Sequence, residues 1–249
     1  MTRGAGRARL GFRPSLLILA GVALLASGAA VSAWSSSLPA KAAHSIRQAL
    51  LARVDQAGSL DVRVVTRPAL GLLRGRVDRL EVTGQGLRVG QIVADRFSLY
   101  GEGLQVDLAA SASTGRLAIS SARQLTLELV MSEQSLNRYL QATNELARLL
   151  YVKLLPEGPR LLLEAQVQDQ VVRFGLDGRL TVESGNVVVL VPDRLSIEQD
   201  GALALQLSLS GADTVLRVEL GDLPVPVVIS GVETGDGELH IFGSYRQAP

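Results

Sequence analysis

The sequence predicts an α+β fold in which a curved, mostly antiparallel sheet wraps around one amphipathic helix. Three observations support this prediction. Segments with the two-residue alternation of β-strands fill most of the chain after residue 58. One long segment between them, Ser132–Leu150, has the period of a helix with a single apolar side. An uncharged, strongly apolar segment precedes both, at residues 16–33, and predicts a separate N-terminal helix.

The N-terminal segment is either a signal anchor or a cleavable signal peptide, which we assign to residues 1–34. Its 18 uncharged residues follow four arginines. This length is sufficient to span a bilayer, and Trp34 would act as an interfacial anchor. Val31 and Ala33 also provide the small residues of a cleavage site. Both alternatives place the body of the protein on the exported side of a membrane.

A linker and a membrane-proximal helix are expected at residues 35–58. Within them, residues 40–56 place Ile46, Leu50 and Val54 on one side of a helix. His44 lies in its first turns, and no second metal ligand follows three or four residues later. We therefore interpret His44 as a solvated side chain.

The first strand block, residues 59–130, is divided by pairs of glycines. The motif Gly84-Gln85-Gly86-Leu87 recurs seventeen residues later as Gly101-Glu102-Gly103-Leu104. An alternating Leu-x-Val follows each motif, so we interpret both as turns between hairpin-like units. A dinucleotide-binding loop is excluded, because Gly90 stands one position too far and a strand follows.

The helix predicted for Ser132–Leu150 begins at a residue that can cap the first turn. Its polar side consists of Asn137, Gln141, Asn144, Glu145 and Arg148. Its apolar side consists of Leu136, Tyr139, Leu140, Thr143, Leu146, Ala147 and Leu150. Because strands flank this helix in the sequence, we expect its apolar side to lie on the sheet and form the core.

The second strand block, residues 151–249, has the same alternation. Leucine occupies every second position of residues 203–209, which predicts a strand with one buried and one solvent-facing side. Pro224 and Pro226 cannot lie in a central strand, so an edge or a connection is expected there. Residues 59–249 are therefore predicted to form one domain.

Composition argues against several functions. The chain has no cysteine, which excludes disulfides, thiol catalysis and thiolate metal sites. Beyond residue 33 it has 21 basic and 24 acidic side chains, so charge gives no reason to expect nucleic acid. His240 is predicted on the polar side of a strand, and no serine stands in a G-x-S-x-G elbow. We therefore predict no catalytic residue, no metal and no cofactor, and a protein that is not an enzyme.

Several segments resemble the LmeA-like phospholipid-binding family of exported or membrane-tethered bacterial proteins. The resemblance covers roughly Ile46–Tyr245. Val130–Leu140 is similar to the "lt-x-x-x-l-n-x-y-l" segment of the family. The other similar segments are Leu72-Leu73-Arg74-Gly75-Arg76-Val77, Leu80-Glu81-Val82, Gly86-Leu87, Gly103-Leu104-Gln105-Val106-Asp107, Leu223-Pro224 and Gly237-Glu238-Leu239.

This resemblance implies export, phospholipid binding and a role in envelope lipid or glycolipid homeostasis. The partners would be phospholipid and, through the N-terminal segment, a membrane. An apolar groove between sheet and helix could hold acyl chains, because each buried CH₂ contributes roughly 0.8 kcal/mol. A tubular lipid-binding barrel is the shape we expect. The apolar side of the helix supplies the candidate lipid-binding residues, which are Leu136, Tyr139, Leu140, Thr143 and Leu150.

Two other functions stay open from the residues alone. A structural or scaffolding domain of the envelope that binds another protein would have a filled core and an exposed apolar patch instead of a concavity. A lipid-active enzyme would need a polar cluster with perturbed pKa values at the mouth of the groove. The apolar pattern does not distinguish a dry core from an open groove.

Overall fold

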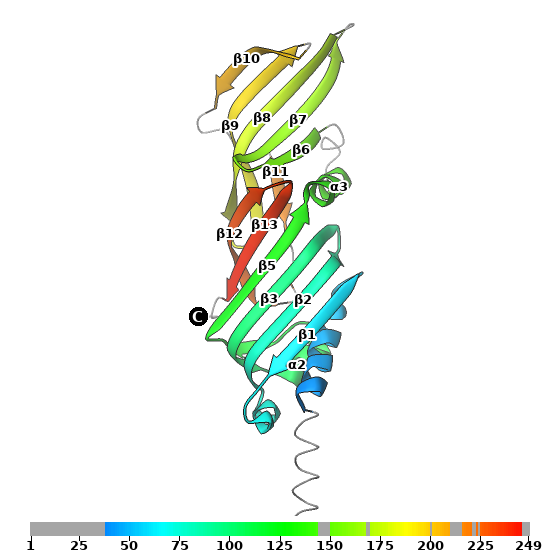
Figure 1. The fold of residues 1–249 in the computed structure, drawn as a ribbon, viewed down its shortest axis with the longest axis vertical. Helices are drawn as coiled ribbons and strands as arrows, with labels where there is room; N and C mark the ends of the chain where they lie inside the picture. The colour runs from blue at the N-terminus through cyan, green and yellow to red at the C-terminus, as the bar shows by residue number, and fades with distance from the viewer. Residues whose placement is uncertain are drawn as a thin grey trace, which may run out of the picture.

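Two antiparallel β-sheets make up most of the molecule, and they lie one beyond the other along its long axis (Figure 1). The computed structural model describes residues 38–143, 150–167, 170–199, 201–209, 216–220, 223 and 225–245. The α+β class and the antiparallel pairing are confirmed. The strands are divided between two sheets, however, where the sequence predicted one.

Sheet A contains the strands of the first block together with the last two strands of the chain. Its order is β1-β2-β3-β5-β13-β12, and β4 pairs with β3. The chain therefore returns to sheet A after it has formed sheet B. The bounds are β1 (Ser59–Val65), β2 (Arg76–Val89), β3 (Ile92–Val106), β4 (Ile119–Ser121), β5 (Gln124–Ser132), β12 (Val227–Gly235) and β13 (Glu238–Tyr245).

Sheet B contains the intervening strands in the order β10-β9-β8-β7-β6. The long strand β9 pairs with β10 through its C-terminal half and with β11 through its N-terminal half. The bounds are β6 (Leu150–Leu155), β7 (Gly158–Val167), β8 (Gln170–Glu183), β9 (Val187–Gln199), β10 (Ala202–Ser208) and β11 (Leu216–Glu219).

The helices are short, and the first of them covers part of sheet A. It spans residues 38–51 and buries Leu38, Ile46 and Leu50 in the hydrophobic core. Figure 1 shows it in dark blue beside and behind β1. The apolar side is therefore confirmed for Ile46 and Leu50, and His44 is exposed as expected. The predicted end at residue 56 is wrong, because the helix ends at residue 51 and Val54 follows it. The remaining helices are η1 (Ala69–Arg74), α2 (Leu108–Thr114) and α3 (Glu133–Thr143).

The helix predicted for Ser132–Leu150 is shorter than expected and lies at the junction of the two sheets. It ends at Thr143, residues 144–149 lie outside the described residues, and Leu150 begins β6. Its predicted cap is confirmed, because the Ser132 hydroxyl accepts a hydrogen bond from the Ser135 N–H at 3.2 Å. The helix contacts β3 and β5 of sheet A and β6 of sheet B. It therefore joins two sheets and is not wrapped by one.

The expected tubular barrel is wrong. Sheet A has β1 and β12 at its edges, and sheet B has β10 and β6, so neither sheet closes on itself in the part of the chain that the structure describes. The sheets meet where β12 packs against β6, β7 and β8. The strand β5 pairs with β13 and not with β6, so the strands from β6 to β10 form a second sheet and do not continue sheet A.

The two glycine motifs lie inside strands, not in turns. Gly86 and Gly103 adopt left-handed φ angles of 60° and 59° within β2 and β3, three residues before the end of each strand. At Gly86 the buried positions change from 82 and 84 to 87, so the inward side shifts by one residue. Leu87 then covers Gly84, where an added Cβ would lie 3.2 Å from its methyl group. The motif is therefore a face switch within a continuous strand.

The N-terminal prediction, residues 1–34, lies outside the described residues. None of the helices in the described part of the chain combines the length and the hydropathy that a bilayer crossing requires. Pro226 lies in the connection that precedes β12, as the sequence predicted, and Pro224 lies outside the described residues.

Candidate functional site

The predicted lipid-binding residues of α3 face the junction between the sheets. Leu136, Tyr139 and Leu140 are buried in the hydrophobic core. The Tyr139 hydroxyl accepts a hydrogen bond from the Glu219 N–H at 3.3 Å, which links α3 to β11. Thr143 is exposed at the end of the helix, and its hydroxyl bonds to the Tyr139 carbonyl at 2.9 Å. The structure therefore groups three of the five predicted residues.

Asn137, which the helical period placed on the polar side of α3, is buried instead. Its side-chain amide donates to the Val152 carbonyl at 2.8 Å and accepts from the Val152 N–H at 2.7 Å. These two bonds copy the pairing of a neighbouring strand. Asn137 therefore holds the edge strand β6 against α3, and only three-dimensional pairing could reveal that role.

An apolar pocket lies between the inner face of sheet A and the end of the helix at residues 38–51. We call it the hairpin pocket, because the tip of the β2–β3 hairpin forms one wall. All of its lining side chains are apolar: Leu50, Val54, Leu60, Leu87, Val89, Ile92, Ala94, Phe97, Leu129, Leu220 and Leu223. Val54, Val89, Ile92 and Leu223 are half-buried and form its mouth, whereas the other seven side chains are buried.

The hairpin pocket is nearly filled by its own walls. It encloses about 40 Å³, little more than the roughly 30 Å³ that one water molecule occupies in the liquid. Pockets for small organic ligands usually measure roughly 300–1,000 Å³. The volume therefore excludes an acyl chain from this pocket unless its walls separate, and none of the five predicted residues lines it.

A second apolar surface lies on sheet B, where two rows of side chains cross the five strands from β6 to β10. The strand register aligns Leu150, Leu163, Phe174, Ile197 and Leu205 in the first row. It aligns Val152, Leu161, Leu176, Leu195 and Leu207 in the second row. Because residues opposite each other in an antiparallel pair share a face, all ten side chains lie on one side of the sheet.

These rows are buried only at the end of sheet B that lies near α3. In the second row, Val152 and Leu161 are buried, whereas Leu207 on β10 is 45% exposed. In the first row every side chain is half-buried or exposed, and Leu205 is 44% exposed. We call the open part the distal face. It consists of the first row together with Leu176, Leu195 and Leu207.

The sequence prediction for β10 is therefore wrong. Alternating leucines predicted a strand with one buried side, but every residue of β10 is exposed. The alternation correctly indicated an apolar side, since Leu205 and Leu207 share the distal face. No described element covers that side, because β10 is the edge of sheet B and α3 lies at the opposite edge, against β6.

The opposite side of the same strands is polar. Glu164, Arg173 and Glu198 form one cross-strand row, in which Arg173 Nε bonds to Glu164 at 3.0 Å. Leu203 pairs with Glu198, so it lies on this side and not on the distal face, and it is 59% exposed. Sheet B therefore has one charged side and one side without any charged residue in its two rows.

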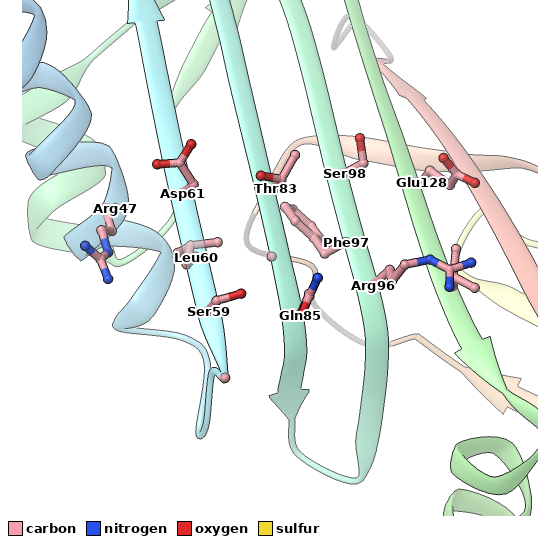
Figure 2. Close-up of a pocket in the computed structure, with 13 residues that line it drawn as sticks. Arg47, Ser59, Leu60, Asp61, Thr83, Gln85, Arg96, Phe97, Ser98 and Glu128 are labelled. Atoms are coloured by element: carbon pink, nitrogen blue, oxygen red, sulfur yellow. The ribbon is translucent and has the colours of Figure 1, made fainter.

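A polar hollow of about 580 Å³ lies on the outer face of sheet A (Figure 2). Figure 2 shows Thr83, Gln85, Arg96, Ser98 and Glu128 on neighbouring strands along it. These residues alternate with the inward-facing core residues of the same strands. Leu60 and Phe97 line both this hollow and the hairpin pocket, which lie on opposite faces of the sheet. Four charged side chains also line the hollow, so it suits an acyl chain less well than an uncharged surface does: Arg47, Asp61, Arg96 and Glu128.

A group of titratable side chains borders this hollow: Arg96, Glu128, Glu238 and His240. Arg96 donates two hydrogen bonds to Glu238, at 3.0 and 2.6 Å, and they lower the pKa of that carboxyl below its ordinary value. His240 Nδ1 lies 3.1 Å from Glu128. As predicted, His240 is on the polar side of its strand. The group lies away from both apolar surfaces, so it does not form the polar mouth that a lipid-active enzyme needs.

Within the described ranges, no group of three or more His, Asp or Glu side chains could hold a metal ion. The distal face was missed at the sequence level except for Leu150, the only predicted residue that belongs to it. The available signal was the alternation within β7, β8, β9 and β10. It predicts an apolar side for each strand, but it does not indicate which sides other elements cover.

Fold and surfaces together define a class of protein. In the part of the chain that the structure describes, it has two open antiparallel sheets, few helices and an uncharged apolar face that no described element covers. The chain belongs to the LmeA-like phospholipid-binding family, whose sequence profile matches residues 36–244. This family is named for lipid binding and not for catalysis. Neither the curated proteins nor the solved structures include a match to the chain.

Proposed function

We propose that this protein is an exported, membrane-associated phospholipid-binding protein that shields acyl chains and serves envelope lipid or glycolipid homeostasis. Family membership supports phospholipid as the ligand. The apolar segment at residues 16–33, behind four arginines, supports export and attachment to a membrane.

The observation that carries this proposal is the distal face of sheet B. A soluble domain rarely leaves a contiguous apolar surface open unless that surface binds something. Acyl chains gain free energy from burial alone, at roughly 25 cal/mol per Å² of apolar surface, and they need no hydrogen-bonding partner. A face without charged side chains therefore suits them better than it suits a polar ligand.

Native mass spectrometry of the full-length chain, extracted from bacterial membranes in a mild detergent, tests this function. We expect phospholipid to stay bound at near-stoichiometric level after the detergent is removed in the gas phase. A control membrane protein with one spanning helix, extracted in the same way, sets the level of non-specific lipid. The proposal would be wrong if the protein carried no more lipid than this control and took up no added phospholipid.

One observation favours a second candidate function, a scaffold that binds another envelope protein. A filled interior and an exposed apolar patch were expected of a scaffold, and the small hairpin pocket and the open distal face match those two features. Family membership favours lipid as the occupant. The scaffold predicts a stoichiometric protein partner on the distal face and lipid only at the control level.

A further inference from the structure

We propose that a single phospholipid molecule binds the distal face with an acyl chain laid across the strands, along the row from Leu205 to Leu150. This inference rests on the proposed function and assigns its site. The row is contributed by five strands, and each position in it is apolar: Leu205, Ile197, Phe174, Leu163 and Leu150.

The dimensions of the row match one acyl chain. Strands in a sheet are about 4.8 Å apart, so the four spacings between five strands give a row of about 19 Å. The hydrocarbon core of a bilayer is about 30 Å thick, so one leaflet corresponds to about 15 Å of chain. A chain of that length therefore fits within the row. The second row, through Leu195 and Leu207, provides a parallel apolar track beside it.

Volume argues against the hairpin pocket as the site of the acyl chain. The hairpin pocket, at about 40 Å³, cannot hold a chain without separation of its buried walls. The distal face needs no such rearrangement, because Leu205 and Leu207 are already 44% and 45% exposed. The free energy of chain burial is therefore available on sheet B without the loss of any existing core contact.

Charge favours a single lipid over the surface of an anionic bilayer. Binding to such a surface draws on an excess of Lys and Arg, each of which contributes about 1 kcal/mol. On the polar side of sheet B, the row Lys153, Arg160, Asp177, Arg194 has three basic side chains and one acidic one, whereas the row Glu164, Arg173, Glu198 has one basic side chain and two acidic ones. Arg160 is also hydrogen-bonded to Asp177 through two nitrogens. The sheet therefore has no one-sided basic surface.

The test uses the full-length chain in proteoliposomes with a phosphatidylcholine that carries a photoreactive diazirine near the end of one acyl chain. After irradiation, peptide mapping locates the crosslinks. We expect them on peptides of β7 to β10. The variant Leu205→Glu should reduce these crosslinks at least fivefold, because it places a charge at the β10 end of the apolar row, where the surface is most open.

Leu203→Glu is the matched control. It makes the same change on the same strand, at a residue that is more exposed (59% against 44%) but lies on the polar side. It should leave the crosslinks unchanged. Ala94→Val, which fills the hairpin pocket, should leave them unchanged as well. Circular dichroism of each variant establishes that the sheets are formed.

A different lipid site, a second copy of the chain on the distal face, or the absence of bound lipid would each give a different result in this experiment. Equal losses in Leu205→Glu and Leu203→Glu, or crosslinks confined to hairpin-pocket peptides, would overturn the proposed site and leave the proposed function standing. A dimer that dissociates only in Leu205→Glu, without any crosslink on β7 to β10, would assign the face to a second copy of the chain. Absence of crosslinks from all described strands would contradict the function and the site together.

Discussion

Asp95 on β3 fixes the point at which β5 changes into α3. One carboxylate oxygen accepts a hydrogen bond from the Ser132 N–H at 2.6 Å, and the other accepts from the Ser135 hydroxyl at 3.1 Å. Burial alone would raise the pKa of Asp95, but the hydrogen bonds from Ser132 and Ser135 outweigh it, and the pKa lies below its ordinary value. The ionised carboxylate is therefore the form that the fold stabilises.

Asp95→Asn should lower the free energy of unfolding by about 1.5–3 kcal/mol at neutral pH, the range for hydrogen bonds to a charged group. Since the folded state lowers the pKa of Asp95, its contribution is complete above the unfolded value of about 3.9 and is lost as the pH falls through the folded value. Urea titrations between pH 3 and 7 should therefore show the difference between wild type and variant shrinking below about pH 4. Asp61→Asn is the control, since Asp61 pairs only with the exposed Arg63.

Gly86 is required for its backbone conformation and not for space. Its φ of 60° is left-handed, and the nearest atom to an added Cβ would be 3.7 Å away. A left-handed conformation costs an ordinary L-residue roughly 1–2 kcal/mol, whereas Asn tolerates it better. The glycine therefore allows the inward side of β2 to shift without strain.

Gly86→Ala should lower the free energy of unfolding by about 1–2 kcal/mol, and Gly86→Asn should lower it by less. Gly235→Ala is the control, because no atom lies within 4 Å of its added Cβ and its φ is not left-handed. Thermal unfolding of the three variants measures the effect. Equal loss in Gly86→Ala and Gly86→Asn would show that space, and not φ, selects glycine at this position.

Sheet B divides into a half that stabilises the fold and a half that is left open. Leu161 and Leu163 lie two residues apart on the same side of β7. Leu161 is in the hydrophobic core, whereas Leu163 is only half-buried and lies outside it. Their cross-strand partners differ in burial as well. Leu161 pairs with Val152, which is buried and hydrogen-bonded to Asn137 of α3, whereas Leu163 pairs with Leu150, which is only half-buried.

Leu161→Ala should therefore lower the free energy of unfolding by about 2–5 kcal/mol, the range for a leucine in a packed core. Leu163→Ala should lower it by less than about 1 kcal/mol, because its side chain makes few contacts that the substitution removes. Urea denaturation of the lipid-free protein compares the two. A loss of 2 kcal/mol or more in Leu163→Ala would mean that the distal face is covered in the folded protein.

Individual elements were predicted better than their arrangement. The N-cap at Ser132 and the apolar side of the helix that contains Ile46 follow from local rules, and the structure confirms both. The end of α3 was placed too late, since Leu150 fits the helical period although it begins β6. The distal face could not be predicted, because alternation specifies an apolar side of a strand and only tertiary packing determines whether another element covers it.

The molecule as a whole separates two uses of apolar surface. In sheet A and the adjoining half of sheet B, the apolar sides are packed against each other, against α3 and against the helix at residues 38–51. In the distal half of sheet B the same kind of surface continues, and no element within the described residues covers it. A ligand that binds there adds burial to a fold that is already complete, so binding should stabilise the protein without refolding it.

A short-chain phosphatidylcholine, used below its critical micelle concentration, should therefore raise the melting temperature of the full-length protein. At a ligand concentration of 100 times Kd, the gain in free energy of unfolding is about 2.7 kcal/mol. This gain should change little between 50 and 500 mM NaCl, because salt screens charges and the distal face has none. Leu205→Glu should lose the gain and Leu203→Glu should keep it. A gain that disappears at 500 mM NaCl in wild type would show that charged side chains bind the headgroup and that apolar burial is not the main source of affinity.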